Sequence, residues 1–156
     1  DTSIQWLQYR ILHRILPTNY YLKKINVISY DVCTFCKENV ETIQHVFMTC
    51  SEILPIWNNL SMYIYRKTSN RIGFNVKNVL FGELPFNGYN KVVNFIILYS
   101  KQYIFNCSKQ DKKPDIVGML HHLSFKYKVE KYIAIKSCEI TKFNKLWVNW
   151  KNIFEI

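Results

Sequence analysis

Four residues with metal-binding side chains lie close together in the first third of the chain, with the spacing Cys33-x2-Cys36-x8-His45-x4-Cys50. Zinc prefers sulfur and nitrogen ligands in a tetrahedron, and two cysteines separated by two residues form a turn that directs both sulfurs to one point. Four protein ligands leave no position open for water, so we predict one structural zinc ion. The alternative is that Cys33 and Cys36 are small core residues and that His45 is an ordinary hydrogen-bonded histidine.

The other cysteines and histidines lack such a pattern. Cys107 and Cys138 have no histidine or cysteine at ligand spacing, so we expect both to be buried apolar side chains. His121 and His122 are adjacent and would project in different directions from a helix, so we expect them to face solvent or phosphate. At the predicted zinc site, thiolate is the form of cysteine that binds, so zinc affinity should fall as the pH drops.

The elements that must position these ligands are predicted to be helices. Glycine and proline number only four each, which favours helices over a β architecture with many turns. The fold class that we predict is all-α: a small helical domain with a CCHC zinc knuckle, followed by a basic helical bundle. Apolar residues at three- and four-residue spacings predict the following helices. They cover residues 3–16 (ended by Pro17), a short stretch after Thr18, 41–50, a stretch from Ser51, 76–81, 89–106, a stretch after Pro114, and 140–154.

The predicted helix over residues 89–106 is apolar nearly all round, so we expect it to be the central, buried one. Most of the glycines, with Pro85, lie between residues 67 and 90. We therefore predict a zinc-binding helical part at 1–66, a connecting segment at 67–90 and a basic C-terminal helical part at 91–156.

The cysteine content, the length of the apolar runs and the first residue indicate where the protein is located and whether it is part of a longer one. Five cysteines and no secretory signal favour a reducing, intracellular location, nuclear and cytoplasmic. The longest apolar run, near residues 92–99, is too short and too polar to span a bilayer, so we expect no membrane partner. The chain begins with Asp1 instead of methionine, which indicates a segment of a longer protein.

Charge is distributed unevenly along the chain. Residues 1–60 hold five basic and five acidic side chains, whereas residues 61–156 hold the other sixteen basic and six acidic ones. The whole net charge of +10 therefore lies after the cysteine cluster. This excess predicts a polyanionic partner, RNA and/or DNA. A basic but merely solvated surface is the alternative.

Three basic groups are the candidate nucleic-acid contacts. The first lies around the start of the predicted connecting segment, the second precedes Pro114, and the third alternates with Tyr127 and Tyr132 in a pattern that suits stacked bases and paired phosphates. The second group would surround a helix N-terminus, which attracts phosphate. The candidates are Arg66, Lys67 and Arg71; Lys109, Lys112 and Lys113; and Lys126, Lys128 and Lys131.

The first sixty residues resemble the zinc-binding region that follows the polymerase domain in LINE-type non-LTR retrotransposon polyproteins. The resemblance is carried by a tryptophan-bearing helix, a Leu-Pro-Thr turn, the two-cysteine knuckle, an ET-x-x-H helix, and a last cysteine before a second tryptophan. These are Trp6, Leu16-Pro17-Thr18, Cys33/Cys36, Glu41-Thr42 with His45, Cys50 and Trp57. Beyond residue 60 the similarity is looser and includes Leu80–Gly82.

The resemblance implies that the parent protein is a reverse transcriptase with an endonuclease, acting by target-primed reverse transcription. This segment would hold template RNA and/or target DNA and would contact the rest of the polyprotein. We expect it to be non-catalytic. The Pro114-Asp115 pair that a related nuclease would use is followed by Glu130 and then Tyr132, where a lysine is needed. The alternative function is a zinc-stapled scaffold that makes protein contacts only.

Overall fold

The computed structural model describes residues 2–85, 87–150 and 153–154. The predicted all-α fold class is confirmed, because the described residues contain helices and one isolated β-bridge between Val32 and Val40 but no strand. The helices are α1 (Thr2–Leu12), α2 (Asn19–Lys24), the π-helix η1 (His45–Thr49), α3 (Leu54–Thr68), α4 (Val76–Phe81), α5 (Gly88–Lys109), α6 (Ile116–Lys136), α7 (Ile140–Trp147) and the 3-10 helix η2 (Val148–Trp150).

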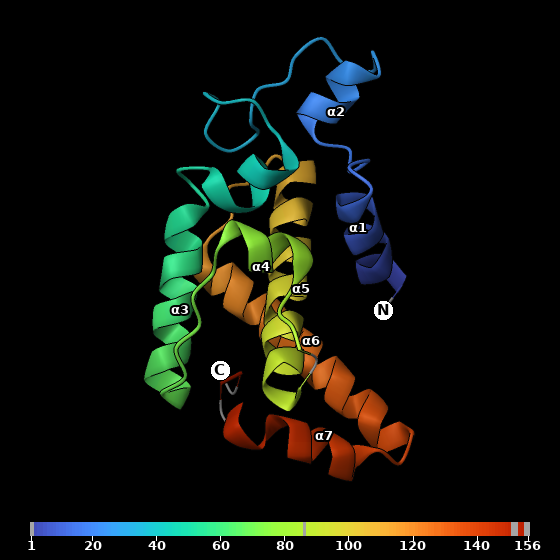
Figure 1. Cartoon of the computed structure of the whole chain (residues 1–156), viewed down its shortest axis with the longest axis vertical. Coiled ribbons are helices and arrows are strands. Elements are labelled where there is room, and N and C mark those ends of the chain that lie inside the picture. The colour runs from blue at the N-terminus through green and yellow to red at the C-terminus, as the bar shows by residue number, and fades with distance from the viewer. Residues whose placement is uncertain (1, 86, 151–152, 155–156) are drawn as a thin grey trace.

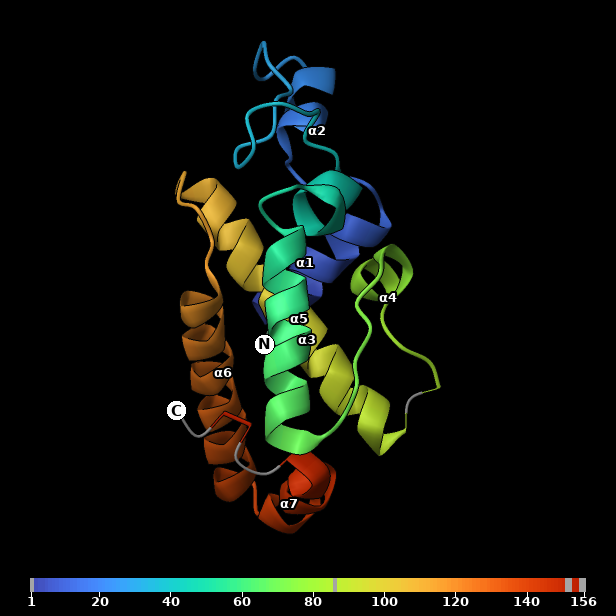
Figure 2. The same ribbon diagram turned by 90° about the vertical axis from the view of Figure 1, so that its left-hand side faces the viewer.

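Helix α5 is the centre of the fold, as its apolar surface predicts (Figure 1). It contacts α1, α4, η1, α6 and α7. Val92, Ile96 and Ile104 of α5 are completely buried. The loop before η1 lies at one end of the molecule and α7 lies across the other end, as both views show (Figures 1 and 2).

Helix α1 ends earlier than predicted, and proline is not the cause. Arg14 adopts a left-handed conformation with φ 57°. The Arg14 N–H donates to the Ile11 carbonyl, and the Ile15 N–H donates to the Arg10 carbonyl. This pair of bonds is a Schellman motif, which satisfies the last carbonyls of a helix. The chain is therefore already turned before it reaches Pro17.

Two other helix predictions are wrong in extent. The predicted helix over residues 41–50 is shorter, at 43–49, and mostly of another type, because residues 43–44 are α-helical and His45–Thr49 form the π-helix η1. The predicted last helix is interrupted, because α7 gives way to 3-10 geometry at Val148. The short helix at 76–81 is confirmed, and an Asn75–Asn78 capping box explains where it begins.

A single hydrophobic core includes residues from all three predicted parts of the chain, 1–66, 67–90 and 91–156. It includes Leu7 and Trp57 before residue 67, Val79 within 67–90, and Ile97 and Trp147 after it. The zinc loop is thus attached to a core that the C-terminal helices also build. None of the described helices has the length and apolarity that are needed to cross a membrane.

Candidate metal centre

The first two ligands lie in the loop that follows α2. The Lys37 N–H donates to the Cys33 carbonyl at 3.0 Å, which closes the turn between the cysteines, and Lys37 is left-handed with φ 58°. The Phe35 N–H points to Cys33 Sγ at 3.4 Å. A bond between Cys33 N–H and the Asn39 carbonyl at 2.7 Å closes the loop behind the turn. This backbone geometry directs both cysteine side chains to the same side.

The other two ligands are brought together by the π-helix η1. Residues five apart on an α-helix point about 140° away from each other, because each residue turns the helix by about 100°. In η1 the Cys50 N–H donates instead to the His45 carbonyl at 3.0 Å, five residues back. This wider turn places His45 and Cys50 on one side of the chain, which explains why a regular helix does not form here. Such π segments are frequent at functional sites.

The four ligand atoms form a compact cluster, and two of their separations match those that zinc requires. All of them lie within 4.8 Å of one another. The Cys33 and Cys50 sulfurs are 3.9 Å apart, and Cys36 Sγ is 3.4 Å from His45 Nε2. Sulfurs at 2.3 Å from a tetrahedral zinc are about 3.8 Å apart, and a sulfur and a nitrogen about 3.5 Å. The site therefore fits one structural zinc ion held by Cys33, Cys36, His45 and Cys50.

The pKa values of the three cysteines differ within the cluster. Burial raises the pKa of Cys33 to about 12 and also raises the pKa of Cys50. Burial acts on Cys36 in the same direction, but the backbone N–H groups of Asn39 and Glu38 outweigh it and lower the pKa of Cys36 to about 6. Buried thiolates are costly without a compensating charge, and Zn²⁺ would supply that charge.

A buried glutamate connects the elements around the knuckle. Glu41 is only 1% exposed. One of its carboxylate oxygens accepts the Asn19 N–H at 3.0 Å, and the other accepts the Thr34 N–H at 2.6 Å. Asn19 is the first residue of α2, and Thr34 lies between the two cysteines of the knuckle. Glu41 therefore fixes the knuckle against α2, a role that the spacing of the ligands alone does not reveal.

Two further residues of the sequence motif have structural roles. Thr42 Oγ1 accepts the His45 N–H at 3.0 Å, which caps the turn that carries the histidine. The indole N–H of Trp57 donates to the Phe47 carbonyl at 2.6 Å, and Trp57 is 1% exposed. Trp57 thereby connects the π-helix to α3 and to the core.

Two of the three lysines in the basic group before α6 already bind other residues of the chain. Lys109 donates to the Pro17 carbonyl at 2.5 Å, and Lys113 pairs with Glu52 at 2.5 Å. Lys112 is exposed. The carboxylate of Asp115 accepts the Gly118 N–H and so already caps α6. A phosphate at this helix N-terminus would face that carboxylate, which weakens the predicted role of the helix end.

The third basic group stands on a helix face that is more apolar than the sequence pattern indicates. Lys128 and Lys131 are exposed, and the Lys126 amine lies 5.2 Å from the centre of the Tyr99 ring. Most side chains that point outward from α6 are apolar or aromatic. They are Val117, Phe125, Val129, Tyr132, Ile133 and Ile135.

The first basic group lies at the end of α3. Arg66 is exposed, Lys67 lies 5.9 Å from the centre of the Tyr63 ring, and Arg71 lies 5.1 Å from the centre of the Tyr65 ring. The structure therefore does not gather the nine predicted contacts on one surface. They occupy the end of α3, the loop before α6, and α6 itself.

The cysteines and histidines outside the zinc site differ in how far they are buried. Cys107 is 8% exposed, so its predicted burial is confirmed, whereas Cys138 is exposed at the end of α6 and its predicted burial is wrong. His121 is exposed as expected. His122 instead packs near Tyr99 and Tyr103, and burial, with a smaller effect of Lys126, lowers its pKa to about 4. His122 is thus half-buried, whereas the sequence led us to expect an exposed side chain.

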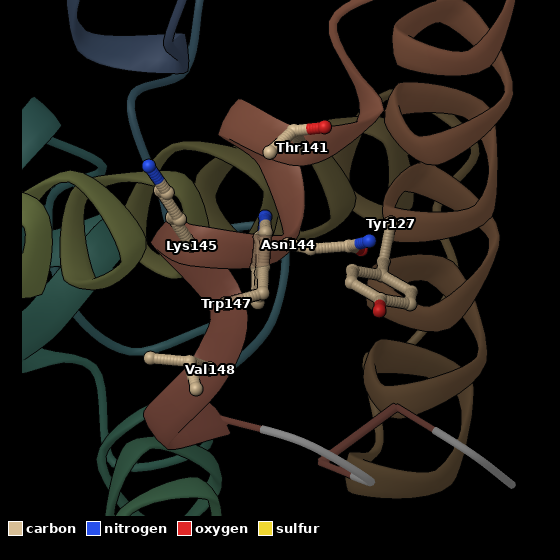
Figure 3. A pocket seen from close by; sticks show the side chains of 6 residues that line it. All are labelled: Tyr127, Thr141, Asn144, Lys145, Trp147 and Val148. Atoms are coloured by element: carbon tan, nitrogen blue, oxygen red, sulfur yellow. The ribbon is translucent and has the colours of Figure 1, made fainter.

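A hollow of about 560 Å³ lies between α6 and α7, where Figure 3 shows Tyr127, Asn144 and Lys145 around Trp147. Trp147 is only 5% exposed and packs edge-on against Tyr127. No open tryptophan face is therefore available for a ligand to stack on. The hollow adds no ligand to the zinc site, which lies at the other end of the molecule (Figure 1).

A comparison with protein families gives a match in the first part of the chain. Residues 2–57 match the model of a protein family described as zinc-binding in reverse transcriptase. A comparison with curated proteins found no match. The matched segment includes all four ligands, Glu41 and Trp57. Residues 2–57 are therefore similar to a reverse-transcriptase zinc-binding region, and the geometry of their ligands fits one structural zinc ion.

Proposed function

We propose that this chain is a non-catalytic, nucleic-acid-binding segment of a LINE-type reverse transcriptase, acting in an intracellular, reducing compartment, nuclear and cytoplasmic. It would hold template RNA and/or target DNA during target-primed reverse transcription. The zinc ion would staple the loop before η1 to the helical core. The parent polymerase would supply the catalytic carboxylates.

The observation that carries this proposal is the excess of cations that have no acidic partner. The chain has 21 basic and 11 acidic side chains. Ion pairs such as Lys23–Asp31 and Lys113–Glu52 use some of the acids, and Glu41 is buried. Lys112, like many other exposed cations, has no ion-pair partner among the described residues. Phosphates are the anions that such a surface attracts without a specific geometry.

The test is a binding measurement on the whole chain with zinc bound. Fluorescence anisotropy would follow single-stranded RNA, single-stranded DNA and duplex DNA at salt concentrations between about 50 and 200 mM. We expect the logarithm of the binding constant to fall linearly with the logarithm of the salt concentration. Absence of binding to all three at physiological salt would overturn the proposal.

The outward face of α6 favours a second function, a scaffold that contacts the rest of the polyprotein. Phe125, Tyr132 and Ile133 are 61%, 59% and 52% exposed, so α6 presents an apolar face that no described element covers. Contiguous exposed apolar surface is typical of protein contacts. Isothermal titration with the neighbouring polymerase segment would test this function. Phe125→Asp and Ile133→Asp together should abolish the interaction while leaving nucleic-acid binding intact.

A further inference from the structure

A groove beside the zinc loop is lined by four separate elements. Its walls come from the end of α1, from α2, from the residues just before η1, and from α4. Its volume is about 600 Å³, within the range of about 300–1,000 Å³ that is common for ligand sites. Apolar side chains such as Ile11, Ile43 and Leu80 form part of its lining. No local sequence pattern predicts this groove, because its lining residues are separated by up to seventy positions, from 11 to 81.

Two cations line the groove, and both are exposed. They are Arg14, which is held in its left-handed conformation by the end of α1, and Lys24, which ends α2. Neither has an acidic partner among the described residues, and no acidic side chain belongs to the described lining. Nearby acids are already engaged, since Asp31 pairs with Lys23 and Glu41 binds two backbone N–H groups. The groove is therefore positively charged.

Two aromatic rings with open surface line the same groove. Tyr20 of α2 is 48% exposed, and Phe81 at the end of α4 is 64% exposed. This differs from the hollow between α6 and α7, where Trp147 is almost completely covered. An exposed phenylalanine or tyrosine beside free cations is the combination that single-stranded nucleic acid uses, because bases stack on the rings while phosphates pair with the cations.

We infer that this groove binds a short stretch of single-stranded nucleic acid, with bases on Tyr20 and Phe81 and phosphates at Arg14 and Lys24. The inference rests on the proposed function and assigns it to a surface outside the three basic groups expected from the sequence. An apolar protein segment is the competing occupant. Two cations without an acid in the described lining favour the polyanion over that segment.

The experiment uses the whole zinc-loaded chain and oligonucleotides of about 12 residues, single-stranded RNA and single-stranded DNA in separate arms. The first variant is Tyr20→Leu with Phe81→Leu, which keeps the groove apolar but removes both rings. We expect affinity to fall about tenfold or more, because stacking is lost. The matched control is Phe125→Leu, since Phe125 is exposed to 61% on α6 and is remote from the groove. The control should bind like the unmodified chain.

The second variant is Arg14→Asn with Lys24→Gln. Asn is chosen because it tolerates the positive φ at position 14. Loss of two phosphate contacts should lower the salt slope by about 1.4, at about 0.7 per phosphate of a single strand. Lys91→Gln with Lys145→Gln removes the same charge from exposed positions outside the groove and should leave the slope unchanged.

A direct measurement does not depend on the variants. Photocrosslinking with 5-iodouridine-substituted RNA should label Tyr20 or Phe81, as read by mass spectrometry. If the unmodified chain binds but both groove variants match their controls and the crosslinks lie elsewhere, the inference is wrong and the proposed function stands. If the leucine variant binds like the unmodified chain, the rings do not stack bases and the inference is overturned. If the unmodified chain binds no nucleic acid, both fail.

Discussion

The zinc loop and the core around α5 are stabilised by different forces. Between α2 and η1, apolar side chains such as Val27 and Tyr30 are 62% and 55% exposed, so burial contributes little. That loop is held by backbone hydrogen bonds, by Glu41 and by the four zinc ligands. In α5, by contrast, Val92 and Ile96 are completely buried. The stability of the zinc loop should therefore depend on the metal, whereas the stability of the core depends on hydrophobic burial.

The largest effect is expected when the zinc site is broken. Cys36→Ser removes one thiolate, so zinc should be lost together with most of the ordering of the loop, because binding and folding of such sites are coupled. Metal analysis and hydrogen exchange would measure this, with amides of the loop exchanging rapidly and amides of α5 staying protected. The control is Cys138→Ser, an exposed cysteine away from the site. A Cys36→Ser chain that keeps a full zinc ion would refute the ligand set.

A substitution in the core should lower the stability of the fold but leave the zinc ion bound. Ile97→Ala removes a side chain that is 1% exposed on α5, so we expect a loss of about 2–5 kcal/mol in the free energy of unfolding. Denaturant unfolding would measure the loss, and zinc content at neutral pH should stay at one ion per chain. If zinc were lost along with stability, the two regions would not be distinct.

The support of the zinc loop by Glu41 is tested by Glu41→Gln. The amide keeps one acceptor but places an NH2 group against a backbone N–H, so the knuckle should be less well oriented. We expect zinc affinity to fall about tenfold or more, as is typical when a supporting partner of a metal site is changed. Competition with a chelator would measure it. Glu38→Gln, in the same loop but exposed, should leave the affinity unchanged.

The last prediction is a change in pH dependence, and it concerns a buried lysine of the core. Lys101 is 1% exposed, its amine donates to Gln8 Oε1 at 2.5 Å, and burial lowers its pKa from 10.5 to about 7. Between these two pKa values the unfolded chain binds a proton that the folded chain does not. Lys101 therefore makes stability rise with pH across that window by up to about 1.4 kcal/mol per pH unit, and makes it lower below pH 7.

Lys101→Met should remove that contribution. Urea unfolding at several pH values between 7 and 10 would compare the slopes of the two proteins, with zinc kept in excess. We expect the variant to show a flatter dependence on pH. Equal slopes would mean that Lys101 stays protonated in the folded chain.

The fold was largely predictable because apolar periodicity is a local property. The pattern predicted α4, the central place of α5 and the short helix after Thr18, each of which depends on residues close together in the chain. The end of α1 was mispredicted because a left-handed Arg14 can end a helix without glycine or proline. Cys138 was mispredicted because it lies in the turn between α6 and α7, where it adopts a left-handed conformation with φ 59°, and not on a buried helix face.

The sequence by itself determined the four zinc ligands and the excess of positive charge, because metal chemistry restricts ligand types and short spacings restrict geometry. Only the tertiary structure decided how residues five apart reach one ion, since the π-helix at His45 results from the site as a whole. Tertiary structure also decided that Lys109 binds the Pro17 carbonyl and that Lys113 pairs with Glu52. It placed Arg14 and Lys24 in one groove with Tyr20 and Phe81. Surfaces are formed by residues from distant segments, so their composition follows from packing and not from local pattern.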